Sequence, residues 1–223
     1  MSAQPGLLRR LYLGPRGHPP AVANPYRDEV SGLDRPGAAR RRRRNLEAYL
    51  ERVGPARLLL LGEALGFRGG RFSGIAFTSE RQLAGASPWR LPWAGPRWAA
   101  TSLHPRLFQE PSATIVWRAL GGEPSGVLLW NAFPWHPWGE TRGPLSNRRP
   151  ATGAVDANLD LLARVLERCG GAEVVAVGRT AQRALARLGV SAPCLRHPAH
   201  GGGERFSRGV RDLLGSRLGR VLY

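Results

Sequence analysis

Four short apolar runs, separated by segments with helical periodicity, most constrain the fold of this chain. The runs are Leu58–Leu61, Val127–Trp130, Val174–Val177 and Cys194–Arg196. Short, continuously apolar strands are typical of parallel sheets that are buried on both faces. Their alternation with helices indicates βαβ units. We therefore predict an α/β fold, with three α-β-α layers around a central, mainly parallel four-stranded sheet.

The helices and the domain limits follow from the same pattern. Helical periodicity is found in five segments, which are 36–53, 112–120, 155–169, 180–188 and 204–214. Residues 1–25 are rich in Pro, Gly and Arg and show little periodicity, so we predict a loosely ordered N-terminal arm. Residues 26–223 then form a single domain. The tryptophans of its Trp- and Pro-rich stretch are expected to pack in the core rather than to stack on bases; they are Trp89, Trp93 and Trp98.

The charge balance favours a polyanionic partner. The formal net charge is +17, and all 33 basic residues are Arg. A GC-rich genome explains Arg in place of Lys, but it does not explain the excess of positive charge, and Arg binds phosphate through a bidentate fork. The run Arg40–Arg44 is either a solvated helix face or a DNA contact. Without Lys, Schiff-base chemistry through a side-chain amine is excluded.

Other features exclude several classes of protein. No segment approaches the roughly 20 apolar residues of a membrane-spanning helix. The N-terminus has no apolar signal core, so we expect a cytoplasmic location and no membrane association. Cys169 and Cys194 alone cannot hold a tetrahedral zinc or an iron–sulfur cluster, and His197 and His200 lack a third partner. We therefore expect no metal, no cofactor and a monomeric protein.

Polar residues follow three of the four apolar runs. Glu63, Asn131 and His197 come shortly after the first, second and fourth run. Because the carboxyl ends of parallel strands meet at one edge of a sheet, and ligands bind there, we expect these side chains to form one polar cleft.

Five motifs in this order resemble those of the uracil-DNA glycosylase superfamily. They are Gly62–Gly66, Gly74–Phe77, Asn131, Asn147–Pro150 and His197–Ala199. The resemblance runs from about residue 24 to residue 214 and is greatest to the iron–sulfur branch, family four. It implies a DNA repair glycosylase that flips uracil out of DNA and hydrolyses its N-glycosidic bond.

The chain departs from that branch at several positions. Trp135 and Asn158 stand where the branch has cluster cysteines, so the chain resembles a relative without the cluster. Leu65 replaces the Pro of the first motif, and Ala199 replaces the Ser of the last. In members that push a Leu into the base stack, that Leu follows the last motif, where this chain offers His200.

The resemblance assigns a role to each matching residue. Glu63 and His197 are the implied catalytic residues: Glu63 stabilises the cationic sugar and orients the water, and His197 donates a hydrogen bond to the uracil anion. Phe77 stacks on the base and Asn131 reads its edge, beside Gly62 and Ala64. The expected DNA-binding residues are Arg68, Arg71, Arg148 and His200.

Alternatives remain open at each level. Glu63 could cap a helix or pair with an Arg, Asn131 could be a turn residue, and His197 could be structural. For the whole chain, the alternatives are a glycosylase for another deaminated base, such as hypoxanthine or xanthine, and a damaged-DNA-binding protein without turnover. The strand preference for single- or double-stranded DNA is left open.

Overall fold

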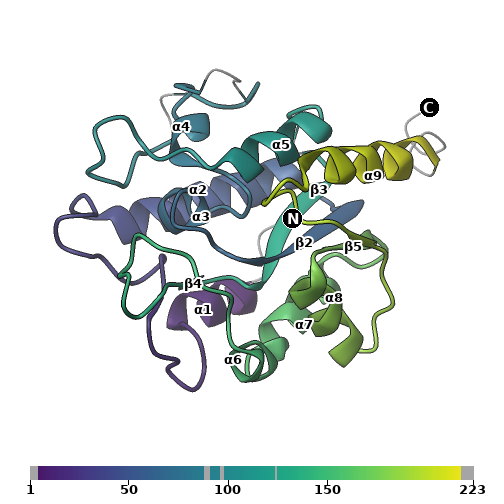
Figure 1. Cartoon of the computed structure of the whole chain (residues 1–223), viewed down its shortest axis with the longest axis horizontal. Helices are drawn as coiled ribbons and strands as arrows, with labels where there is room; N and C mark the ends of the chain where they lie inside the picture. The colour runs from purple at the N-terminus through teal and green to yellow at the C-terminus, as the bar shows by residue number, and fades with distance from the viewer. Residues whose placement is uncertain (1–4, 88–90, 96–97, 124, 217–223) are drawn as a thin grey trace.

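The computed structural model describes residues 5–87, 91–95, 98–123 and 125–216 and places a sheet between two layers of helices (Figure 1). The sheet contains β2 (Leu58–Ala64), β3 (Val127–Phe133), β5 (Glu173–Val177) and β6 (Cys194–Leu195). Its order is β3-β2-β5-β6, and all neighbours are parallel. The predicted three-layer α/β fold is confirmed.

The two central strands extend beyond the predicted runs. β2 continues to Ala64 and β3 to Phe133, and in this extension Gly62 pairs with Asn131. The ladder therefore includes positions that we expected to lie in loops. Main-chain hydrogen bonds of a sheet consequently fix the positions from which Glu63 and Asn131 project.

Helices cover both faces of the sheet (Figure 1). One layer, above the sheet in this view, contains α2 (Ala38–Val53), α3 (Gly70–Ser73), α4 (Glu80–Leu83), α5 (Pro111–Ala119) and α9 (Gly203–Ser216). The other contains α1 (Pro5–Leu13), α6 (Thr152–Asp156), α7 (Leu159–Arg168) and α8 (Arg179–Arg187). A small antiparallel pair, β1 (Val22–Ala23) with β4 (His136–Pro137), completes the fold. None of the helices in the described ranges has both the length and the apolar composition needed to cross a bilayer.

The single helix expected over 155–169 is instead two helices, with a break at Asn158. The Asn158 amide nitrogen donates to the Ala154 carbonyl, at 2.8 Å. Its oxygen accepts hydrogen bonds from the Arg10 side chain and from the Arg16 main-chain N–H. The break therefore lies where one side chain binds a carbonyl of α6 and two donors of the N-terminal segment.

The N-terminal segment is not the loosely ordered arm that we expected, as far as it is described. Residues 5–13 form α1, whose Leu7 and Leu11 are completely buried in the core. Arg10 forms an ion pair with Asp160 of α7, and the Trp135 indole N–H donates to the Leu11 carbonyl. The i, i+4 spacing of the two leucines was the available sequence signal, and the surrounding Pro, Gly and Arg residues obscured it.

A buried charge cluster fixes the loops beside the central strands. Asp34 accepts hydrogen bonds from both Arg42 of α2 and Arg71 of α3, and all three side chains are at most 1% exposed. Burial alone would raise the pKa of Asp34, but the hydrogen bond from Arg71 and the charges of both arginines hold it below its usual value. Trp93 and Trp98 are buried as predicted, while Trp89 lies outside the described residues.

Candidate active site

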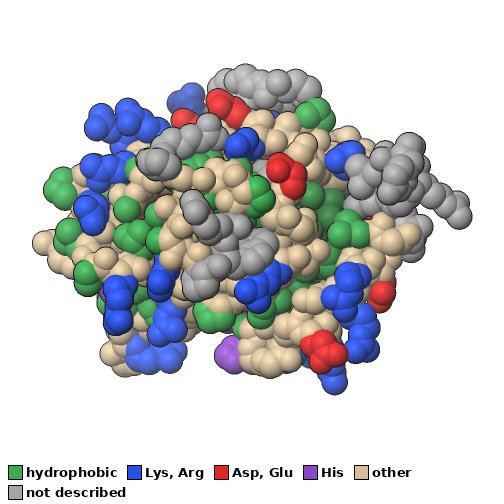
Figure 2. Space-filling view, turned by 90° about the horizontal axis from the view of Figure 1, so that it is seen from above, with side chains coloured by type: hydrophobic (Ala, Val, Ile, Leu, Met, Phe, Trp, Pro, Cys, Tyr) green, Lys and Arg blue, Asp and Glu red, His purple; other side chains and the backbone are tan. Residues whose placement is uncertain are grey.

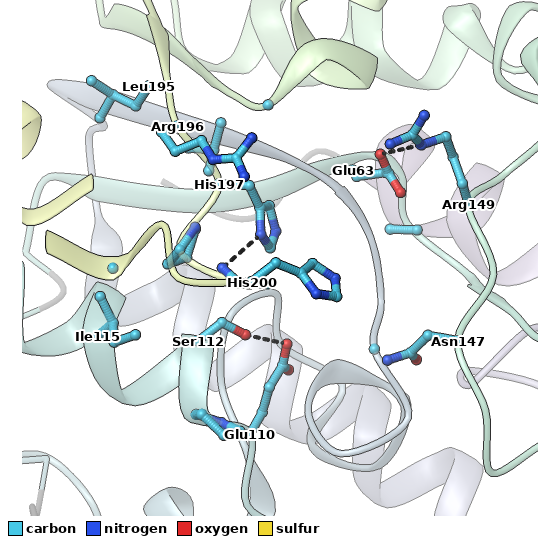
Figure 3. Close-up of a pocket in the computed structure, with 18 of the residues that line it drawn as sticks. Glu63, Glu110, Ser112, Ile115, Asn147, Arg149, Leu195, Arg196, His197 and His200 are labelled. Carbon is cyan, nitrogen blue, oxygen red and sulfur yellow. Dashed lines mark hydrogen bonds and ion pairs between the residues drawn. The ribbon is translucent and has the colours of Figure 1, made fainter. Parts of the chain in front are cut away.

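A cavity of about 1280 Å³ lies where the strands β2, β5 and β6 end. Six of the ten predicted site residues line it: Glu63, Ala64, Arg68, Arg148, His197 and His200. Figure 3 shows how segments that are distant in the sequence bring Glu63, His197 and His200 together around one space. Of the three residues expected to form one polar cleft, Glu63 and His197 line this cavity and Asn131 does not.

Glu63 projects from the extended part of β2 and is held by two partners. The Thr180 hydroxyl, at the start of α8, donates to Glu63 Oε2 over 2.6 Å. Arg149 Nε lies 3.4 Å from the same oxygen (Figure 3). The Glu63 side chain is still 28% exposed, so that a water or a sugar can approach it.

His197 has a defined tautomer when it is neutral. Its Nδ1 accepts a hydrogen bond from the Ala199 main-chain N–H at 3.1 Å, so the proton of the neutral ring is on Nε2 (Figure 3). Burial lowers the pKa of His197, the Glu63 carboxylate acts in the opposite direction, and the charges of His200 and Arg196 lower it further. The ring at neutral pH is therefore uncharged and has one N–H to donate.

Gly62, Phe77 and Asn131 form a second group beside His197 and do not line the large cavity. The Phe77 and His197 ring centroids are 6.1 Å apart. A Cβ on Gly62 would lie 2.5 Å from Asn131 Oδ1 and 2.6 Å from Phe77 Cε2, so only glycine fits this close approach. The Asn131 side chain is buried and forms no hydrogen bond with the described residues. The amide is not among the buried polar atoms that lack a partner, so solvent, or a ligand in its place, can reach it.

Comparison with known proteins assigns this site to a family. Residues 51–214 match the family described as the Uracil DNA glycosylase superfamily. The chain belongs to the uracil-DNA glycosylase superfamily. A solved structure of wild-type SMUG2 from Pedobacter heparinus is similar in fold, with a TM-score of 0.59 at 13% identity. The alignment covers 94% of this chain and 99% of that chain. No significant match was found among curated proteins.

The family makes the chain a DNA glycosylase and confirms the resemblance predicted from the five motifs. The enzymes of this superfamily act on DNA, which agrees with the excess of arginine. On the face seen in Figure 2, arginine side chains lie at the left, in the middle and at the lower right, and acidic side chains are interspersed among them.

The four expected DNA-binding residues differ in their surroundings. Arg68 is exposed beside the cavity, over the Phe67 ring, and His200 is also exposed. Arg148 lines the cavity, but its guanidinium donates to the Trp138 and Pro20 carbonyls, which leaves it a largely structural role.

The prediction for Arg71 is wrong. Its side chain is 1% exposed and is paired with Asp34 at 2.7 Å, so it cannot reach DNA. Arg68 and Arg71 are equivalent in the sequence of this loop. Only the position of Asp34, which is far away in the chain, decides which arginine turns inward.

Three functional candidates were missed by the sequence analysis. Thr180 and Arg149 both contact Glu63, as described above. Glu110 lines the opposite wall, where its Oε1 accepts a hydrogen bond from the Ser112 hydroxyl at 2.6 Å, and burial raises its pKa. Thr180 follows the third apolar run, Val174–Val177, after Gly178 and Arg179, so its position at a strand end was the available signal. Arg149 lies within the motif Asn147–Pro150 but was assigned no role, and no pattern singles out Glu110.

The two residues that stand where the resemblance implies cluster cysteines have another role in this protein. Trp135 and Asn158 both form hydrogen bonds with the N-terminal segment, to the residues Leu11, Arg10 and Arg16. Within the described ranges, no three His, Cys, Asp or Glu side chains are grouped as a metal site requires. Cys169 is buried, Cys194 is exposed, and both are free thiols.

Proposed function

We propose that this DNA glycosylase is a monofunctional uracil-DNA glycosylase, which releases uracil and leaves an intact abasic strand. The observation that carries the proposal is the Asn131 amide, which has no hydrogen-bond partner among the described residues and is held on a strand next to Gly62 and to Phe77, whose ring centroid lies 6.1 Å from that of His197. An amide in this position can donate and accept hydrogen bonds along the edge of one planar ring.

The recognition of uracil follows from the chemistry of this group. The base must leave the duplex, which costs a few kcal/mol. Stacking on Phe77 would return about 1–3 kcal/mol. With its nitrogen toward O4, the Asn131 amide donates to uracil O4 and accepts from N3–H, whereas cytosine presents the opposite pattern at these two atoms. The site would therefore reject cytosine by leaving buried polar groups unpaired.

Glu63 and His197 would then share the chemical step. Cleavage of the glycosidic bond makes a uracil anion and an oxocarbenium-like sugar. The Nε2–H of a neutral His197 donates to the charge that develops on O2. The Glu63 carboxylate stabilises the cationic sugar and orients the water that adds to C1′, while Thr180 holds the carboxylate in place. Because the chain contains no Lys, a side-chain Schiff base that would cleave the strand is unavailable.

The test is incubation of the purified protein with labelled DNA that contains one uracil, single- and double-stranded, followed by alkali. We expect strand cleavage only after alkali, together with free uracil detected by mass spectrometry. Glu63→Gln keeps the shape of the side chain and should abolish release. Asn131→Ala should abolish uracil release and is the control for base reading.

The other outcomes would contradict the proposal in different ways. Release of hypoxanthine or xanthine but not of uracil would show a glycosylase for another base. Tight, salt-sensitive binding to uracil-containing DNA without release of any base would show a binding protein. Cleavage before alkali would contradict the monofunctional reaction.

A further inference from the structure

Arg149 occupies an unusual position at the rim of the cavity. Its Nε faces Glu63 Oε2 at 3.4 Å, yet its side chain is 77% exposed. Among the described residues, Glu63 is its only hydrogen-bond or ion-pair partner. Figure 3 shows the guanidinium beside the carboxylate on the outer side of the cavity. One edge of the fork is therefore engaged, and the rest is open to a ligand from solvent.

The local sequence presents this one side chain. The preceding Arg148 is anchored by two carbonyls, and the following Pro150 is buried. A residue before proline is restricted to extended conformations, so the main chain at Arg149 has little freedom. The main chain of Arg149 is thus held at the cavity entrance by its neighbours, and the ion pair with Glu63 orients its guanidinium.

The charge of Arg149 creates a problem for the reaction proposed above. Glu63 would have to stabilise a cationic sugar, and a guanidinium that pairs with the carboxylate opposes this by repelling the same positive charge. A phosphate on the open edge would neutralise the guanidinium without breaking its contact with Glu63. The five donors of an arginine allow it to serve two acceptors at once.

We propose that Arg149 is a positioning residue that bridges Glu63 and a backbone phosphate next to the flipped nucleotide. The DNA strand then completes the site, because the phosphate neutralises the guanidinium and the bridge fixes the flipped nucleotide relative to Glu63. This inference rests on the proposed glycosylase function and adds a protein contact for one phosphate of the DNA substrate.

Arg179 offers a matched control. It lines the same cavity and is exposed, but no contact with Glu63 is present. Arg149→Gln and Arg179→Gln each remove one positive charge from the cavity rim. A general electrostatic role predicts the same loss for both. The bridge predicts that only Arg149→Gln changes the single-turnover rate at saturating DNA, while Arg179→Gln changes affinity alone.

The decisive experiment replaces, one at a time, each phosphate that flanks the uridine with a neutral methylphosphonate. With the native protein, one replacement should lower the single-turnover rate about tenfold, as expected for a coupled pair of groups. With Arg149→Gln the rate is already lowered, and the same replacement should cause no further loss. With Arg179→Gln the full loss should persist. Circular dichroism and thermal midpoints check that both variants are folded.

Two results would overturn the bridge. One is that the loss of rate caused by Arg149→Gln adds to the loss caused by every flanking phosphate replacement. The other is an Arg149→Gln variant that, like Arg179→Gln, is weakened only in affinity. If the native protein releases no uracil, the proposed function fails by itself, and equilibrium affinity replaces rate in the same cycles. The effect of Arg149→Gln on affinity should then be non-additive with one phosphate replacement and with Glu63→Gln. Additive effects in both comparisons overturn the bridge.

Discussion

Replacing Gly62 with alanine tests whether the group around Asn131 is the base-binding site. The new Cβ would lie 2.5 Å from Asn131 Oδ1 and 2.6 Å from Phe77 Cε2. Ordinary contact needs about 3.5 Å or more, so the ring and the amide must each retreat by roughly 1 Å. A misplacement of about 1 Å in a catalytic site can cost about 100-fold in rate, equivalent to ~2.7 kcal/mol.

We therefore expect Gly62→Ala to lower kcat/KM for uracil-containing DNA about 100-fold. Overpacking should also reduce the free energy of unfolding by about 1–3 kcal/mol. Single-turnover release of labelled uracil gives the first quantity and urea unfolding gives the second. Affinity for undamaged DNA should stay unchanged, because no base enters the site.

Gly153→Ala is the matched control. Gly153 lies in α6, and a Cβ there would meet nothing within 4 Å. This variant should keep native activity and gain up to about 1 kcal/mol of stability from helix propensity. Native activity in Gly62→Ala would refute the reasoning, because a base could not then lie between Phe77 and Asn131.

Three further predictions concern other contacts. Thr180→Val should slow base release about tenfold or more, because a hydrogen bond to the charged Glu63 is lost, and Thr180→Ser should restore the rate in the same assay. Asp34→Asn should reduce the free energy of unfolding by about 3–5 kcal/mol, because two buried arginines lose their counter-charge. The pKa of Asp34 is lowered, so this stabilisation is present above the ordinary pKa of about 3.9 and is lost as pH falls through the lowered value. The free energy of urea unfolding should therefore fall less in acid for Asp34→Asn than for the native protein. The pKa of His197 is also lowered, so the unfolded chain takes up its proton first, and native protein should lose thermal stability relative to His197→Gln as pH falls below about 6.5; equal pH dependence of the two midpoints would contradict this.

The sequence predicted the features that depend on local periodicity. Buried runs such as Leu58–Leu61 become strands wherever they lie, and the ends of parallel strands share an edge, so the convergence of Glu63 and His197 on one cavity could be predicted. The extent of the strands could not be predicted, because Gly62 and Asn131 extend the ladder by pairing with each other. Neither residue has a strong strand preference by itself.

The errors concern side chains whose partners are far away in the sequence. Arg71 was assigned to DNA, since a basic loop does not reveal that Asp34 lies beneath it. Arg149 was overlooked for the same reason, because its contact with Glu63 exists only after the loop folds over β2. The direction in which an arginine points depends on tertiary contacts, whereas its presence in a loop depends only on the sequence.

Trp135 and Asn158 hold the N-terminal segment at one corner of the fold, and this arrangement affects how the protein responds to oxidation. The resemblance to the iron–sulfur branch implies cluster cysteines at these positions in that branch, and a cluster can be lost through oxidation or iron shortage. Here an indole and an amide hold Leu11, Arg10 and Arg16 by hydrogen bonds, which have no redox chemistry. The integrity of this corner therefore depends on the first turns of the chain rather than on metal supply, and removal of α1 would open it in any redox environment.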